Sequence, residues 1–149
     1  MRYWEDFRVG ETFDLGSVTI DGDEMVRFAE RFDPQPFHVD PVAAKDTPFG
    51  GLIASGWFTG SIFMRLYVDA VLVDSASQGS PGMSELRWLS PVRAGDVLTG
   101  RLTVLDVAPS STKQDRGTVF LRGELLRDGE PVVTTTFRGL FGRRPPQSL

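Results

Sequence analysis

Apolar residues follow two different periods along this chain, and the helical period dominates its first half. Four of them are spaced at i, i+3, i+4 and i+7: Met25, Phe28, Ala29 and Phe32. That spacing is typical of one face of an amphipathic helix. Asp21 or Asp23 can cap its first N–H groups, and the helix should stop at Asp33 because Pro34 follows. The pattern therefore predicts a helix that delivers a carboxylate at its C-terminal end.

Three further elements are predicted in the first half. Residues 12–20 read as a short strand, which the turn-forming pair Asp21-Gly22 ends. Residues 41–46 suit a short helical turn with proline at its first position and Asp40 as its cap. Residues 52–73 are apolar on nearly every face, and a helix of that kind is normally buried at the centre of a core. The aromatic residues expected in this core are Trp57, Phe58, Phe63 and Tyr67, although some of them could instead line a channel.

The second half changes to the period of strands. Turn signals such as Asp128-Gly129 separate four extended stretches: residues 83–92, 97–107, 117–127 and 131–141. Several long antiparallel strands and one buried helix predict an α+β fold in which the sheet wraps around that helix. The 149 residues fit a single domain with its core at about residues 3–141, and we expect the tail at 143–149 to be frayed.

Composition excludes several classes of site and partner. The chain has no cysteine and one histidine, which excludes disulfides, thiolate catalysis and a two-histidine metal site within one chain. The net charge of −4 and the dispersed basic residues argue against nucleic acid. Residues 1–10 lack the apolar run of a signal peptide, and polar residues interrupt residues 52–73, unlike a membrane span. We therefore expect a soluble cytoplasmic protein.

The single histidine follows the carboxylate at the end of the first helix, in the segment Asp33-Pro34-Gln35-Pro36-Phe37-His38. Imidazole exchanges protons near neutral pH because its ordinary pKa is about 6.5. The two prolines fix their own φ angles and push Asp33 and Gln35 toward extended geometry, so we expect a stiff, non-helical loop. A carboxylate and an imidazole held in this way favour acid–base chemistry.

Four segments resemble, in order and spacing, the MaoC-like acyl dehydratases. They are Tyr3-Trp4-Glu5-Asp6-Phe7 with Val9-Gly10-Glu11, Phe28-Ala29 with Asp33-Pro34-Gln35-Pro36-Phe37-His38-Val39-Asp40, Ile53-Ala54-Ser55-Gly56, and Pro91-Val92-Arg93-Ala94-Gly95-Asp96. The resemblance extends over about residues 3–141, and the segment from Asp33 to His38 is its most specific part. It implies a hotdog fold, a strongly curved antiparallel sheet around a central helix, and a homodimer with its substrate channel near the dimer interface.

The resemblance also implies roles for single residues. Asp33 and His38 match the family's catalytic pair, and Gly56 matches the glycine whose N–H polarises the thioester carbonyl. Four positions depart from the family pattern: Phe32, Gln35, Ser55 and Met64. Gln35 replaces the usual Asn, and Ser55 stands where (R)-specific enoyl-CoA hydratases often carry His. We expect both beside the substrate or the oxyanion, and these changes leave the identity of the substrate open.

The expected reaction is the addition of water to, or its removal from, the double bond of a 2-enoyl-CoA thioester. Asp33 would act as the base toward water, and His38 would orient that water; which of the two delivers the proton to C2 stays open. The Gly56 N–H, near the start of the buried helix, can stabilise the enolate oxygen. The substrate is then an acyl-CoA or acyl carrier protein thioester, and the chemistry needs neither a metal nor a redox cofactor.

Three other functions stay open at this point. A dehydratase of branched or dicarboxylic acyl-CoA would be favoured if Arg65 faced a pocket. Hotdog thioesterases usually rely on a carboxylate on the central helix, where Asp69 is the one available, or on a differently placed Asp. A non-catalytic acyl-CoA-binding protein would bind the thioester without turnover. The site residues also have purely structural interpretations, with Asp33 ending a helix, His38 satisfied in the core and Gly56 allowing close helix packing.

Overall fold

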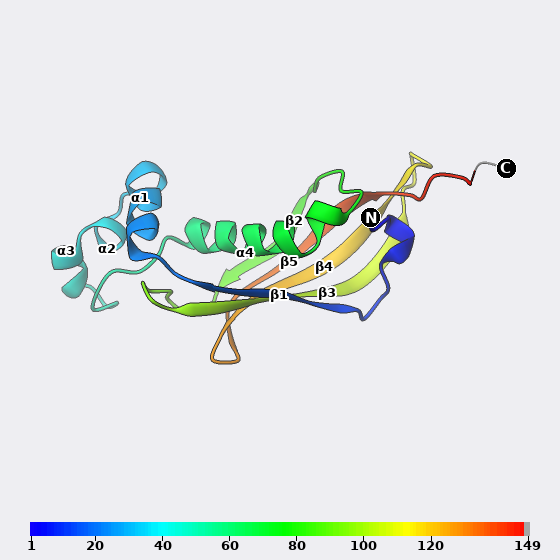
Figure 1. Cartoon of the computed structure of the whole chain (residues 1–149). Coiled ribbons are helices and arrows are strands. Elements are labelled where there is room, and N and C mark those ends of the chain that lie inside the picture. Colours follow the sequence, from blue (N-terminus) through cyan, green and yellow to red (C-terminus); the bar gives the residue numbers. More distant parts are fainter. Residues whose placement is uncertain (148–149) are drawn as a thin grey trace.

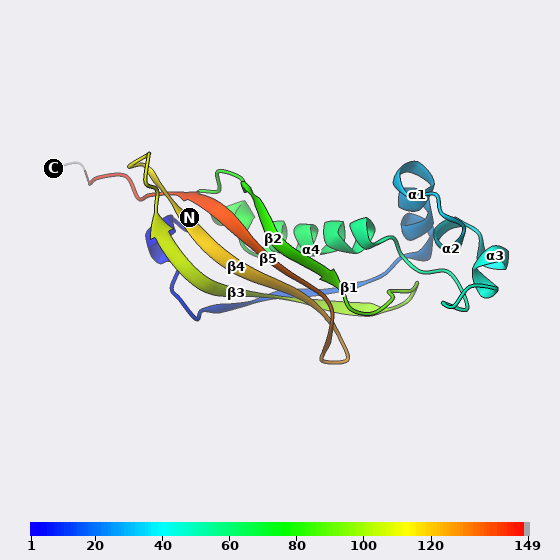
Figure 2. The same ribbon diagram turned by 180° about the vertical axis from the view of Figure 1, so that it is seen from behind.

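A curved five-stranded sheet forms the larger layer of the computed structural model, which describes residues 1–147. The strands within that range are β1 (Thr12–Thr19), β2 (Gly82–Trp88), β3 (Val97–Pro109), β4 (Arg116–Arg127) and β5 (Glu130–Gly142). Their order is β1-β3-β4-β5-β2, and every neighbouring pair is antiparallel. Seen from behind in Figure 2, β2 lies at the edge of the sheet beside β5.

The central helix α4 (Gly56–Ala70) lies along one face of this sheet (Figure 1). Its buried side chains Phe58, Phe63 and Tyr67 belong to the same core as sheet residues such as Leu102. Burial of large aromatic side chains supplies much of the stability of such a core. The predicted α+β architecture, a curved antiparallel sheet around one long helix, is confirmed.

The central helix begins later than the predicted range 52–73. The N–H of Ile53 donates to the carbonyl of Phe37, and the N–H of Ala54 donates to the carbonyl of Val92. These two bonds hold the first residues of the predicted range in an extended conformation between two loops. The helix therefore starts only after this extended segment, at Gly56, and the predicted start was one turn too early.

The end of the central helix and one of its aromatic residues also differ from prediction. The helix ends at Ala70, and a 3-10 turn, η2 (Leu72–Asp74), follows it. Trp57 was expected in the core but is 59% exposed. It lies in the first turn of α4, and its ring packs edge-on against Trp88, the last residue of the edge strand β2. Among residues 1–147, no helix combines the length and the apolar character needed to cross a membrane.

Three short helices gather at one end of the molecule (Figure 1). They are α1 (Gly22–Phe32), α2 (Pro36–Val39) and α3 (Pro41–Lys45). Asp21 caps α1 by accepting hydrogen bonds from the N–H groups of Asp23 and Glu24. As predicted, α1 ends just before Asp33, and Asp40 caps α3. Local capping and proline signals thus define this end of the molecule.

The loop between Asp33 and His38 is only partly as predicted. Asp33 and Gln35 are non-helical, but Pro36–Val39 form one helical turn. Proline takes the first position of this turn, where a missing N–H costs nothing, and the N–H of Asp40 donates to the Pro36 carbonyl. His38 therefore lies on a short helix, and the prediction of a wholly non-helical loop was wrong.

The four strands predicted in the second half are confirmed, with shifted ends. β2 ends at Trp88 rather than at residue 92, because Pro91 has no N–H to offer a ladder. Asp128-Gly129 turns β4 into β5 with φ angles of 52° and 80°, the left-handed geometry that short hairpins require. Each of the four strand pairings contains a register shift. Such bulges increase local twist and help the sheet curve around the helix.

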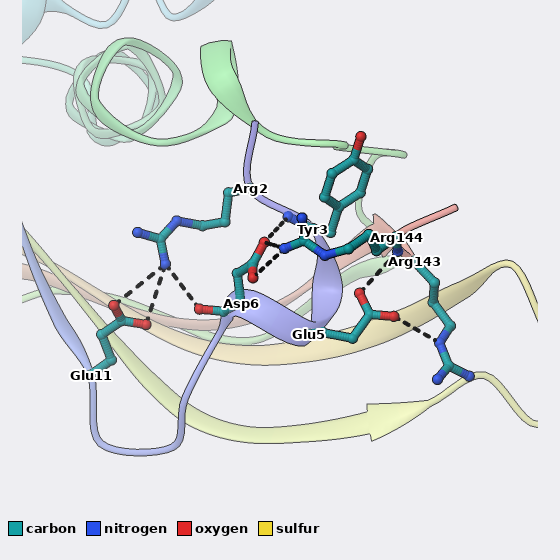
Figure 3. Close-up of polar contacts among 7 residues, drawn as sticks. All are labelled: Arg2, Tyr3, Glu5, Asp6, Glu11, Arg143 and Arg144. Carbon is teal, nitrogen blue, oxygen red and sulfur yellow. Dashed lines mark hydrogen bonds and ion pairs between the residues drawn. The ribbon is translucent and has the colours of Figure 1, made fainter. Parts of the chain in front are cut away.

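The two chain ends meet at the opposite end of the molecule from the short helices (Figures 1 and 3). Arg143 pairs with Glu5 at 3.1 Å and Arg144 pairs with Asp6 at 2.6 Å. Both acids belong to the 3-10 turn η1 (Trp4–Asp6). Residues 143 and 144 of the tail that we expect to be frayed thus contact this turn, and the last two residues of the tail lie outside the described part of the chain.

Candidate active site

Asp33 and His38 face each other where α1 ends and α2 begins. Oδ2 of Asp33 lies 3.2 Å from Nε2 of His38. The histidine is 5% exposed, and the Asp33 side chain is 20% exposed. The structure thus brings together the two residues that the sequence singled out, with the imidazole buried and the carboxylate partly open to solvent.

A backbone carbonyl orients the His38 ring. Nδ1 lies 2.8 Å from the carbonyl oxygen of Ile53. A carbonyl can only accept, so Nδ1 carries the hydrogen of this bond. In the neutral ring Nε2 is then unprotonated and faces Asp33. Nε2 is therefore the atom at which His38 can gain and lose a proton.

Two neutral donors hold the Asp33 carboxylate. The side-chain amide of Gln35 donates to Oδ1 at 2.7 Å, and the hydroxyl of Ser55 donates to Oδ2 at 2.8 Å. Burial pushes the pKa of Asp33 upward, but these hydrogen bonds and the charge of protonated His38 outweigh it. The pKa of Asp33 consequently lies below its ordinary value, and the group is a carboxylate at neutral pH.

The start of α4 forms the third part of the site. Ser55 is fully buried and occupies the N-cap position, but it makes no side-chain cap because its hydroxyl is bonded to Asp33. Gly56 is the first residue of the helix, where backbone N–H groups have no intrahelical partner. Among the described residues, no acceptor is bonded to the Gly56 N–H. That donor and the positive end of the helix dipole are thus available to an oxyanion.

Trp88, on the edge strand, covers Gly56, a contact that the sequence did not predict. Its indole N–H donates to the Gly56 carbonyl at 2.9 Å. A Cβ added at Gly56 would overlap the Trp88 ring, so only glycine fits this position without a shift. The two residues are 32 positions apart, and no local pattern connects them.

The site lines a cavity of about 380 Å³. Asp33, His38, Gly56, Trp57 and Trp88 contribute to its wall, together with residues 89–92. Its remaining lining residues are Phe49, Ile53, Ala54 and Thr59. Ser55 and Gln35 reach the site through Asp33 rather than by lining this cavity. The arrangement offers a carboxylate, an imidazole and a free N–H to a molecule bound there.

The arginine considered for a second substrate carboxylate lies elsewhere. Arg65 pairs with Asp69 at 2.8 Å on an exposed face of α4. Neither side chain lines the site cavity. The geometry of the single chain therefore offers no support for Arg65 as a carboxylate-binding residue or for Asp69 as a thioesterase carboxylate.

Comparisons with known proteins identify the family of this chain. The sequence model described as MaoC like domain matches residues 6–121. A 3-hydroxybutyryl-CoA dehydratase from Methylorubrum extorquens is 31% identical over 135 residues, covering 88% of this chain and 82% of the relative. An (R)-specific enoyl-CoA hydratase from Rhodospirillum rubrum is 27% identical over 144 residues, covering 93% of this chain and 95% of the relative.

A solved structure shows the same similarity in three dimensions. The crystal structure of a MaoC-like dehydratase from Rhodospirillum rubrum superposes with a TM-score of 0.89 at 40% sequence identity. The superposition covers 98% of this chain and 100% of that one. The curved sheet around α4 is therefore a hotdog fold, and the chain belongs to the MaoC-like family of hydratases and dehydratases.

Proposed function

We propose that this protein is a hydro-lyase that adds water to, or removes it from, the double bond of a 2-enoyl-CoA thioester. The observation that carries the proposal is the Asp33–His38 pair, 3.2 Å apart in the wall of a cavity that also contains Gly56. The names of two full-length relatives, a hydratase and a dehydratase of CoA esters, support the class of substrate.

The proposed mechanism uses each group at the atom that the geometry makes available. Asp33, ionised at neutral pH, accepts a proton from a water whose oxygen adds to C3 of the enoyl group. His38 orients that water through Nε2, the ring atom not bonded to Ile53. The proton taken up by Asp33 then reaches C2 either directly or by way of Nε2 of His38, 3.2 Å away, so both groups return to their starting state. Water supplies both the hydroxyl group and the added hydrogen, so the reaction balances without a redox cofactor.

Gly56 would stabilise the charge that develops during this addition. Nucleophilic attack at C3 moves electrons onto the thioester oxygen, which becomes enolate-like. A free N–H at the start of a helix is suited to that oxygen, and a preorganised donor of this kind typically contributes about a hundredfold or more in rate. The absence of a side chain at Gly56 makes room for the Trp88 ring, which holds the first turn of α4 in place through the Gly56 carbonyl.

We propose that a second copy of the chain completes the working protein. Large apolar side chains are exposed around the free edge strand and the adjoining face of α4: Trp57, Met64, Met83, Trp88 and Leu89. Exposed apolar surface of this extent favours association. A homodimer would cover it, and the thioester could come from CoA or from an acyl carrier protein.

The direct test is hydration of crotonyl-CoA, followed by the loss of enoyl absorbance. Release of free thiol is measured in parallel on the same samples. Turnover without thiol release is the expected result. Thiol release would instead indicate a thioesterase, and saturable binding of the ester without either change would indicate a binding protein.

A further inference from the structure

A second cavity lies beside the candidate active site. It has a volume of about 410 Å³ and lies between α4 and the strands β2 and β5. Apolar side chains dominate its wall, among them Phe63, Leu86 and Val133. It contains neither Asp33 nor His38, so it does not itself carry the proposed chemistry.

Trp57 separates the two cavities. Among residues 1–147, it alone lines both of them. Its neighbours along α4 divide between the two sides, with Gly56 on the catalytic side and Gly60 on the apolar side. A chain extending from the active site into the apolar cavity would therefore have to pass this indole.

The indole of Trp57 rests against a fixed neighbour. Its ring centroid is 5.5 Å from that of Trp88, and the planes are inclined by 80°. Trp88 is itself held by its hydrogen bond to the Gly56 carbonyl. This edge-to-face contact favours the position between the cavities. The 59% exposure of Trp57 leaves its ring less tightly enclosed than a core side chain.

We propose that Trp57 limits the length of the acyl chain that the enzyme accepts, an inference that rests on the proposed function. The catalytic cavity holds the reacting atoms and a short acyl group. A longer alkyl chain would gain from burial in the apolar cavity, but the Trp57 ring stands between that cavity and the active site. The wild-type protein therefore prefers short 2-enoyl thioesters, and removal of the indole joins the two spaces.

The test compares crotonyl-CoA with trans-2-octenoyl-CoA in wild type, Trp57→Ala and Trp57→Phe. The ratio of kcat/KM for the eight-carbon substrate to that for the four-carbon substrate should rise about tenfold or more in Trp57→Ala. Trp57→Phe should give an intermediate ratio because a smaller ring leaves part of the barrier. Circular dichroism and thermal melting check that both variants fold.

Met64→Ala is the matched control. Met64 also lies on α4, is exposed, and lines the apolar cavity without lining the catalytic one. Its truncation enlarges the apolar cavity without opening the boundary, so the substrate ratio should stay within about twofold of wild type. An unchanged ratio in Trp57→Ala, or an equal rise in Met64→Ala, would overturn the proposal.

A binding measurement separates this proposal from the proposed reaction. Saturated butyryl-CoA and octanoyl-CoA cannot be hydrated, and calorimetry measures their affinities directly. In Trp57→Ala the preference for octanoyl-CoA over butyryl-CoA should increase about fivefold or more relative to wild type, since each buried methylene favours binding. If wild type binds these esters but shows no hydration, the reaction fails while the role of Trp57 is still tested. If wild type binds neither ester, both proposals fail.

Discussion

The two ends of this molecule use charged side chains in opposite ways (Figure 1). At the end where the termini meet, Glu5 and Asp6 pair with Arg143 and Arg144 in largely exposed ion pairs (Figure 3). At the other end, the short helices hold Asp33 beside a buried imidazole, with no Lys or Arg among its partners. The first arrangement ties segments together, and the second leaves a carboxylate able to exchange protons.

The partners of each carboxylate explain the difference. An arginine stays charged at every accessible pH, so it holds a paired acid in its ionised form over most of the pH range. Asp33 instead receives hydrogen bonds from Gln35 and Ser55, and its one cationic partner, His38, can lose its charge. Because exposed ion pairs contribute little stability, changes at the terminal end should be mild. Changes around Asp33 should affect activity far more than folding.

The largest expected effect is on activity. Asp33→Asn and His38→Gln should each reduce kcat/KM for enoyl-CoA hydration by about a hundredfold or more, because each removes a group that accepts or donates a proton in the proposed reaction. Asp40→Asn is the matched control, since this carboxylate lies two residues after His38, caps α3 and does not line the cavity. Asparagine also caps helices well, so that variant should keep its activity. A comparable loss in Asp40→Asn would point to general damage in this region.

The next largest effect is on stability, and it distinguishes two glycines of α4 by what an added Cβ would contact. Gly56→Ala places a Cβ against the Trp88 ring and should lower the free energy of unfolding by about 1–3 kcal/mol, together with activity. Gly60→Ala meets open space, so it should raise the free energy of unfolding by about 0.5–1 kcal/mol through helix propensity. Urea denaturation measures both changes. Equal destabilisation by the two substitutions would contradict the proposed contact with Trp88.

A smaller effect concerns the hydroxyl that holds Asp33. Ser55→Ala removes a buried hydrogen bond and should cost about 1 kcal/mol at pH 7. The folded-state pKa of Asp33 is depressed, so its ionisation stabilises the protein above the unfolded-state pKa, and this stability is lost as pH falls through the folded-state pKa. The substitution should raise the pKa of Asp33 toward its ordinary value.

The pH dependence of unfolding checks this assignment. The difference in unfolding free energy between wild type and Ser55→Ala should shrink as the pH is lowered from 7 to below the ordinary pKa of an aspartate, about 3.9. Ser61→Ala is the control, because its hydroxyl donates to a helix carbonyl on the exposed side of α4. A difference that is the same at both pH values would show that the Ser55 bond does not stabilise the ionised form.

Local signals in the sequence predicted the elements that local chemistry determines. The end of α1 follows from Pro34, and its start follows from Asp21. The strands of the second half follow from alternation between glycine-containing turns such as Asp128-Gly129. The placement of Asp33 and His38 in one site follows from the short, proline-stiffened segment between them, although its last part is helical.

Long-range contacts determined what the sequence did not predict. The extended conformation before α4 depends on carbonyls of Phe37 and Val92, which come from two other loops. Trp88 packs over Gly56, although the two residues are 32 positions apart in the sequence. The contact of Arg143 with Glu5 joins the two ends of the chain, and no local pattern indicates it. The candidate pair Asp33 and His38 could be named from the sequence, but the boundary of their cavity could not.

The smallest expected effect concerns the ion pairs at the end of the molecule where the two termini meet. Hydrogen bonds from the Arg144 N–H and the Arg143 guanidinium outweigh burial and hold the pKa of Glu5 below its ordinary value. Glu5→Gln should therefore lower stability by less than about 1 kcal/mol, a fall in Tm of at most about 3 °C, and leave activity unchanged. Glu130→Gln is the control, because Glu130 is exposed and makes no ion pair within residues 1–147.

High salt and low pH should each remove the difference in Tm between Glu5→Gln and Glu130→Gln. Screening at 1 M salt weakens an exposed ion pair, so the Tm gap should narrow there. It should also close as the pH falls through the depressed pKa of Glu5, since a protonated carboxyl no longer pairs with Arg143. A gap that persists under both conditions would mean that Glu5 acts by packing rather than by charge. A change in kcat/KM would contradict the separation of the two ends, because it would couple the terminal ion pairs to a site at the far end of the molecule.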